Sequence, residues 1–222
     1  MKLFLDTAIL DEIKEADSWG VLDGVTTNPS LAAKAGRHFK DNIMAISELI
    51  GERAGTVSAE TVSTDTEAMI EEAQLVTSWA SNIIAKIPLT PAGLAAVNRL
   101  SQDGVPTNVT LVFSANQGLL AMKAGATYVS PFIGRIDDAG SDGMQVIRDL
   151  VEIKEIYGFE TEILAASIRH PLHVTEAALA GADIATMPFN IFKKMFGHPL
   201  TDTGLQSFLD DWATIDEGMR PF

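Results

Sequence analysis

The chain repeats one pattern of hydrophobic and polar positions from end to end: a short apolar run, then an amphipathic stretch. The amphipathic stretches place apolar residues three or four positions apart, which is the spacing of one helix face. After the second run, for example, Phe39, Ile43, Ile46 and Ile50 share a face. The short runs lack this spacing, and we predict that they are strands buried on both sides. They lie at 2–6, 24–29, 56–61, within 82–91, and at 106–112, 127–132, 161–167 and 183–188.

Eight such repeats predict one architecture. They recur about every 26 residues, which leaves room for short loops only. No linker, charge block or low-complexity stretch separates them. We therefore predict a single α/β domain over 1–222 that folds as a (β/α)8 barrel. An open doubly wound sheet is the alternative, but it usually carries a glycine-rich phosphate loop after an early strand, which this sequence lacks. The stretch 203–218 has an apolar stripe, and we predict an extra C-terminal helix there that packs on its own barrel or on another subunit.

Composition narrows the classes of function. The 222 residues have a formal net charge of −14, so we expect neither a nucleic-acid partner nor an anionic membrane surface. The absence of cysteine excludes disulfides and thiol chemistry and fits a reducing compartment. The first residues turn acidic too soon for a signal peptide, and no apolar run of about 18 residues could span a bilayer. We expect a cytoplasmic protein, and the four scattered histidines predict no metal site.

Lys86 is the charged residue of the fourth apolar run, within Asn82–Pro91. Burial disfavours the ammonium form, so a lysine held in such a strand has a larger share of neutral, nucleophilic amine. The alternative is that Lys86 pairs with a carboxylate at the end of the sheet.

Polar residues also stand near the carboxyl ends of the other predicted strands, and in barrels of this kind those ends face one cleft. The candidates are Asp6, Thr27, Asn28, Glu60, Lys86, Asn108, Thr110, Ser130, Arg135, Ser167 and Arg169. Each alone has a structural explanation, such as a helix cap, a turn or a solvated surface charge. Together they predict a site for a polyhydroxylated, phosphorylated carbonyl compound.

Amine catalysis uses such a set of residues. A neutral lysine attacks a ketone and forms an iminium, which withdraws electrons from the neighbouring carbon–carbon bond. Asp6 and Glu60 are candidates for the acid/base steps, and Thr110 for holding a water. Arg135 and Arg169 follow the sixth and seventh strands, where barrel enzymes commonly bind phosphate.

Several of these residues stand in motifs that resemble the transaldolase family in its short-chain form. The motifs are Asp-Thr at 6–7, Gly-Val-Thr-Thr-Asn-Pro-Ser at 24–30, Ile-Ala-Lys-Ile-Pro at 84–88, Asn-Val-Thr-Leu-Val-Phe-Ser at 108–114 and Ser-Pro-Phe-Ile-Gly-Arg at 130–135. The resemblance runs from residue 3 to at least residue 187. It implies transfer of a dihydroxyacetone unit between a phosphorylated ketose and a phosphorylated aldose, with no cofactor.

The resemblance also implies a role for each residue. Lys86 is similar to the Schiff-base lysine, Asp6 to the acid/base residue of bond cleavage, and Glu60 with Thr110 to the pair that holds the catalytic water. The substrate-binding positions are Thr27, Asn28, Asn108, Ser130 and Phe132 on the sugar side, with Arg135, Ser167 and Arg169 as phosphate contacts.

The fructose-6-phosphate aldolase subgroup is the nearest rival, because it releases free dihydroxyacetone. That subgroup typically has glutamine where this chain has Glu60 and tyrosine where it has Phe132, so the transferase is favoured. The sequence also leaves open a phosphosugar-binding barrel without turnover and a different Schiff-base aldolase, such as one acting on deoxyribose phosphate. The short subfamily tends to form homo-oligomers of five or ten subunits, which favours an intersubunit position for the C-terminal helix.

Overall fold

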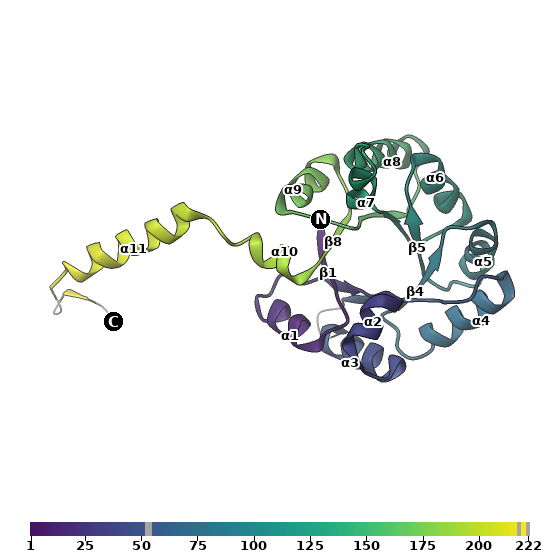
Figure 1. Cartoon of the computed structure of the whole chain (residues 1–222), viewed down its shortest axis with the longest axis horizontal. Helices are drawn as coiled ribbons and strands as arrows, with labels where there is room; N and C mark the ends of the chain where they lie inside the picture. Colours follow the sequence, from purple (N-terminus) through teal and green to yellow (C-terminus); the bar gives the residue numbers. More distant parts are fainter. Residues whose placement is uncertain (52–54, 217–218, 221–222) are drawn as a thin grey trace.

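The computed structural model describes residues 1–51, 55–216 and 219–220. Its eight strands are all parallel, and they close into a barrel because β1 pairs with β8 as well as with β2 (Figure 1). The strands are β1 (Lys2–Asp6), β2 (Gly24–Thr26), β3 (Thr56–Glu60), β4 (Ile83–Pro88), β5 (Thr107–Val112), β6 (Tyr128–Pro131), β7 (Glu162–Ala165) and β8 (Ile184–Met187). The predicted (β/α)8 barrel is confirmed.

Helices α1 to α10 surround the barrel, and α11 lies beyond it (Figure 1). They are α1 (Leu10–Ser18), α2 (Pro29–Ala35), α3 (Phe39–Gly51), α4 (Thr66–Thr77), α5 (Pro91–Gln102), α6 (Ala115–Ala124), α7 (Ile133–Asp138), α8 (Gly143–Tyr157), α9 (Pro171–Ala180), α10 (Phe189–Lys194) and α11 (Pro199–Ala213). The short helices α2, α7 and α10 were not predicted. Asn28 caps the start of α2, since its Oδ1 atom accepts a hydrogen bond from the Leu31 N–H at 2.9 Å. In the described part of the chain, no helix is long and apolar enough to cross a membrane.

Side chains alternate between two sides of every strand, as the period of a β-strand requires. The odd-numbered apolar residues, such as Leu5 and Ile87, face the helices and join the main core. The even-numbered apolar residues form a second, smaller core inside the barrel, which contains Phe4, Ile84, Tyr128, Leu164 and Ile184.

Phe4 fills the barrel next to Gly24, where a Cβ atom would lie only 2.6 Å from the phenyl ring. Glycine is therefore required on β2 for this packing. The even-numbered residues nearer the carboxyl ends, including Asp6, Lys86 and Ser130, are polar and lie above this apolar floor.

The C-terminal helix α11 extends away from the barrel (Figure 1). None of its residues is buried, and Leu205 and Phe208 of the predicted stripe are 59% and 73% exposed. The prediction that the C-terminal helix packs on its own barrel, one of the two alternatives, is therefore wrong. The helix also begins at Pro199 rather than at 203 and ends at Ala213, and positions 217 and 218 of the predicted range lie outside the described residues.

Candidate active site

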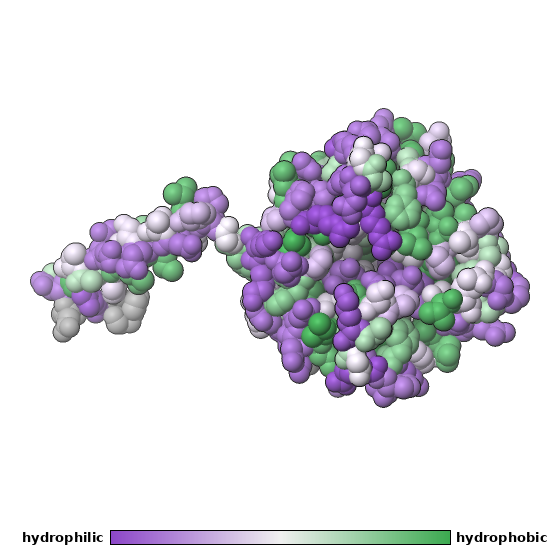
Figure 2. Space-filling view, in the orientation of Figure 1, coloured by the Kyte–Doolittle hydropathy of each residue, from purple (hydrophilic) through white to green (hydrophobic). Residues whose placement is uncertain are grey.

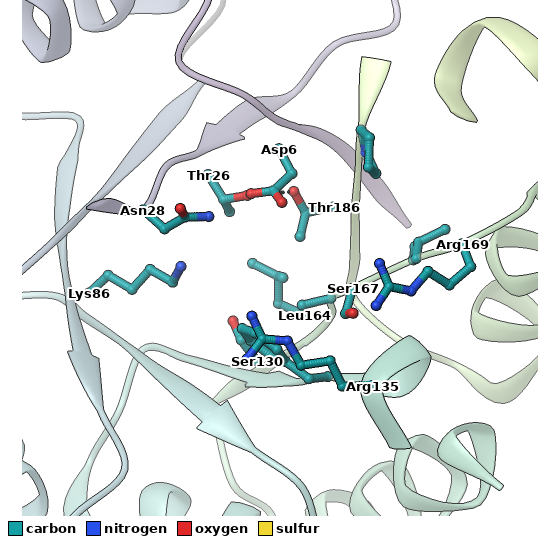
Figure 3. A pocket seen from close by; sticks show the side chains of 14 residues that line it. Asp6, Thr26, Asn28, Lys86, Ser130, Arg135, Leu164, Ser167, Arg169 and Thr186 are labelled. Carbon is teal, nitrogen blue, oxygen red and sulfur yellow. Dashed lines mark hydrogen bonds between the residues drawn. The ribbon is translucent and has the colours of Figure 1, made fainter. Parts of the chain in front are cut away.

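A cavity of about 190 Å³ opens at the carboxyl ends of the strands (Figure 3). Hydrophilic side chains gather around the centre of the barrel in the space-filling view (Figure 2). Of the predicted site residues, the cavity is lined by Asp6, Asn28, Lys86, Ser130, Phe132, Arg135, Ser167 and Arg169. It is also lined by residues that were not predicted, namely Thr26, Leu164, Ala166, Ile168, Thr186 and Pro188.

Lys86 lies inside the barrel with only 5% of its surface exposed. Its Nζ atom is 2.9 Å from Oε2 of Glu60 and donates to the carbonyl oxygen of Thr27 at 3.1 Å. The register of β3 and β4 explains the ion pair, because it places Glu60 and Lys86 side by side on the inner face. The expected alternative, a lysine paired with a carboxylate at the sheet end, is thus present in this structure, and the paired lysine also lines the cavity.

Asp6 is held at the end of β1 by Thr26, which in turn contacts Thr186. Its Oδ1 atom accepts a hydrogen bond from the Thr26 hydroxyl at 2.8 Å, and the hydroxyls of Thr26 and Thr186 are 2.7 Å apart. Burial raises the pKa of Asp6, although the positive charge of Lys86 opposes this shift. A carboxyl whose pKa moves toward neutrality is better suited to exchanging protons at physiological pH.

Asn108 lies behind the cavity and supports Ser130. The Ser130 hydroxyl donates to Oδ1 of Asn108 at 2.6 Å, and the Asn108 amide donates to the Ser58 hydroxyl at 3.1 Å. This chain of bonds runs across three strands and fixes the Ser130 hydroxyl at the cavity wall.

Thr110 is fully buried, and its hydroxyl has no hydrogen-bond partner among the described residues. The register of β5 and β6 shifts between Val109 and Val112, and Leu111 has a left-handed φ of 60°. This bulge returns Val112 to the outer core while Thr110 keeps an inward position. An unpartnered buried hydroxyl beside a strained residue is typical of functional sites, where water or a ligand completes the hydrogen bonding.

Thr27 does not line the cavity. Its hydroxyl donates to the carbonyl oxygen of Ser58 at 2.8 Å, so its side chain ties β2 to β3. Its neighbour Thr26 occupies the inward position instead. The alternation along β2 was the signal that distinguishes the two threonines, and the same alternation identifies Thr186 on β8.

Two arginines lie across the cavity from Lys86 (Figure 3). The guanidinium of Arg135 lies 4.9 Å from the centre of the Phe132 ring, and Nη2 of Arg169 is 2.8 Å from Oδ2 of Asp138. Ser167, between them, has a left-handed φ of 60°. The site therefore has a buried amine at one side and two cations at the other. Within the described residues, no group of three or more histidine, cysteine or acidic side chains is arranged to hold a metal ion.

A sequence profile described as transaldolase/fructose-6-phosphate aldolase matches residues 3–219, a span that includes every cavity residue named above. The chain belongs to this family. Among its relatives in the family, a probable transaldolase of Hydrogenobaculum sp. (strain Y04AAS1) is 56% identical over the full length of both chains. Another, from Heliobacterium modesticaldum, is 57% identical over 98% of this chain and 100% of its own. A third, from Methanococcus maripaludis, is 54% identical over 96% of this chain and 97% of its own.

A solved structure, thiamine phosphate pyrophosphorylase from Pyrococcus furiosus, superposes with a TM-score of 0.58 at 15% identity. The superposition covers 84% of this chain and 85% of that one. This likeness concerns the fold alone, because barrels of this kind host many unrelated chemistries.

Proposed function

We propose that the protein is a transaldolase, which moves a dihydroxyacetone unit from a phosphorylated ketose to a phosphorylated aldose through a Schiff base on Lys86. The observation that carries the proposal is the position of the Lys86 amine. It is buried 2.9 Å from Glu60 and opens into the same cavity as Asp6 and two arginines. The relatives named above, each described as a probable transaldolase, support it.

Glu60 is the carboxylate that can take the proton from the paired Lys86. The neutral amine then attacks the C2 ketone of the donor, forming the nitrogen–carbon bond while one amine proton moves to the former carbonyl oxygen. Glu60 returns its proton to that oxygen, which leaves as water, and the iminium forms. The unpartnered hydroxyl of Thr110 is suited to holding this water.

Asp6 is suited to the cleavage step. The C3–C4 bond breaks, its electron pair neutralises the iminium to give an enamine, and the C4 hydroxyl proton passes to the Asp6 carboxylate. The aldose phosphate leaves, an acceptor aldehyde enters, and the same steps run in reverse. Burial raises the pKa of Asp6, which favours uptake of this proton by its carboxylate.

The arginines suit the phosphate end of both substrates. A guanidinium presents several N–H donors to a dianion, and Arg135 and Arg169 lie on the side opposite Lys86 (Figure 3). Ser167 lies between them on the cavity wall. The separation of amine and cations orients a sugar phosphate with its ketone at Lys86.

The donor hydroxyls have partners near the amine. Asn28 and Ser130 line the cavity directly, and Asn108 acts through Ser130. Thr27 is better assigned to orienting Lys86, because its carbonyl oxygen accepts from Nζ and its hydroxyl is engaged with Ser58.

Phe132 and Glu60 favour transfer over release of free dihydroxyacetone. Phe132 has no hydroxyl that could assist protonation of the bound carbanion, so the enamine persists until an aldehyde arrives. A specific reaction follows: sedoheptulose 7-phosphate and glyceraldehyde 3-phosphate give erythrose 4-phosphate and fructose 6-phosphate, a step of the non-oxidative pentose phosphate pathway. The alternative is fructose-6-phosphate aldolase activity.

The deciding experiment incubates the protein with fructose 6-phosphate, with and without erythrose 4-phosphate. We expect sedoheptulose 7-phosphate to form only with the acceptor, and free dihydroxyacetone to form far more slowly. Release of free dihydroxyacetone without acceptor that is faster than transfer would establish the aldolase. A Lys86→Met variant that retains both activities would exclude the Schiff base.

We further propose a cytoplasmic homo-oligomer of five or ten subunits, in which α11 lies on a neighbour. The exposed apolar residues of α11, such as Phe208, support an intersubunit position. Truncation after Pro199 followed by light scattering tests this, and an oligomer of unchanged mass would refute it.

A further inference from the structure

A second cluster of titratable side chains lies behind the two arginines. Its central residue is His173 on α9, which is 5% exposed. The Nδ1 atom of His173 accepts from the backbone N–H of Arg169 at 3.3 Å, and its Nε2 atom lies 3.1 Å from Oδ2 of Asp137 on α7. His173 therefore connects the segment that carries Arg169 to the helix that carries Arg135.

The hydrogen bonds define how this connection works. Because Nδ1 accepts, the neutral imidazole carries its proton on Nε2 and donates it to Asp137. Burial lowers the pKa of His173, and the nearby His170 acts in the same direction, so the neutral form is favoured. The other oxygen of Asp137 accepts from the Gly143 N–H at 2.9 Å, which fixes the carboxylate from both sides.

The backbone brings the same two segments into direct contact. The N–H of Ile133 donates to the carbonyl of Ala166 at 3.0 Å, and that of Gly134 to Ser167 at 3.1 Å. A Cβ atom at Gly134 would lie 2.1 Å from the Ser167 oxygen and 2.7 Å from Cγ of Arg169, so only glycine permits this approach. Small shifts of α7 would therefore move Arg135 relative to Arg169.

A second side-chain pair, Arg169 with Asp138, also links the segments, but its side chains are 49% and 63% exposed. Exposed pairs contribute little, and a bound phosphate would compete with Asp138 for the Arg169 guanidinium. The contact between the buried His173 and Asp137 does not use either arginine side chain, so a bound phosphate would not compete for it.

We propose that His173 is a positioning residue, which acts through Asp137 to hold Arg135 and Arg169 at the spacing that a sugar phosphate needs. This rests on the phosphate site of the proposed function. A shift of about 1 Å in such a group can change its effect by about a hundredfold.

Binding of glucitol 6-phosphate tests the proposal, because this compound has the phosphate but no carbonyl for an imine. Calorimetry with the full-length protein compares it with glucitol. We expect His173→Ala to weaken glucitol 6-phosphate binding about tenfold or more, with KM for fructose 6-phosphate raised equally and kcat nearly unchanged. His173→Gln should restore most of the binding, because its amide N–H can reach Asp137.

Asn82→Ala is the matched control, because Asn82 bonds to Ser47 and Gly55 near the opposite end of the barrel. It should leave glucitol 6-phosphate binding unchanged. Asp137→Asn is the second variant if His173→Ala does not fold, and it should weaken binding in the same way. Unchanged binding in a folded His173→Ala or Asp137→Asn variant overturns the proposal.

The outcomes also separate this proposal from the proposed function. Wild-type protein that prefers glucitol 6-phosphate over glucitol but transfers no dihydroxyacetone would refute the transaldolase and leave the role of His173 to be decided by the variants. Wild-type protein that binds the two compounds equally would refute the phosphate site and the role of His173 together.

Discussion

Replacing Glu60 by glutamine should destabilise the protein through Lys86. The two side chains are 15% and 6% exposed, and their charged atoms are 2.9 Å apart. At an effective dielectric constant of about 20, unit charges at that distance attract by roughly 5–6 kcal/mol. Removing one partner of a buried pair typically costs about 3–5 kcal/mol, because the other charge stays buried. Losing the proton is the alternative to burying an unpaired charge, and for an ordinary lysine this costs about 4–5 kcal/mol at pH 7. The loss of folding stability in Glu60→Gln is therefore limited to about this value.

The assay is thermal and denaturant unfolding at one fixed protein concentration. For a chain of this size, a loss of about 3–5 kcal/mol lowers Tm by roughly 6–20 °C. Glu162→Gln is the matched control, because Lys2 and Glu162 are 2.8 Å apart but are 47% and 31% exposed. It should cost at most about 1 kcal/mol. Adding Lys86→Met to Glu60→Gln should recover most of the loss, since no unpaired charge then remains. A Glu60→Gln variant no less stable than Glu162→Gln at pH 7 would refute the reasoning.

Three further changes test other parts of the site. Asp6→Asn should unfold at a higher temperature than wild type at pH 7. Burial raises the pKa of Asp6 in the folded protein, so wild type loses stability as the pH rises above the pKa of an unfolded aspartate, near 3.9. Sugar cleavage by this variant should fall about a hundredfold or more. A lower Tm would contradict this. Thr110→Val should raise the free energy of unfolding by about 1 kcal/mol, because it removes an unpartnered hydroxyl. It should also slow imine formation in single-turnover trapping. An unchanged trapping rate would exclude the role of Thr110 in holding water. Arg169→Ala should raise KM for fructose 6-phosphate about tenfold to a hundredfold while leaving KM for an unphosphorylated donor unchanged, and an equal rise for both donors would place the phosphate elsewhere.

The barrel could be predicted from the sequence because each strand is a short apolar run and most of the helices have a clear apolar face. The helices α2, α7 and α10 were missed because each is only six or seven residues long, and a short segment has too few turns to show a helical period. The position of α11 could not be predicted, because an apolar stripe shows that a surface is covered but not by which chain.

Most of the site could be predicted because parallel strands bring their carboxyl ends together, whatever their separation in sequence. Thr26 lines the cavity and its neighbour Thr27 bonds to Ser58, and the alternation of side chains along β2 is the sequence signal that separates the two. The ion pair of Lys86 does not follow from the sequence alone, because it depends on the register of β3 and β4. The connection through His173 was not predicted, since it joins α7, α9 and the segment of Arg169, whose contacts only the folded barrel defines.

Borohydride reduction in the presence of fructose 6-phosphate, followed by mass mapping of the peptides, is the most direct measurement of the central claim. We predict a reduced three-carbon or six-carbon adduct on Lys86 and none in Lys86→Met. Full transfer activity without any adduct on Lys86, or an adduct on another lysine that supports turnover, would contradict the proposed chemistry.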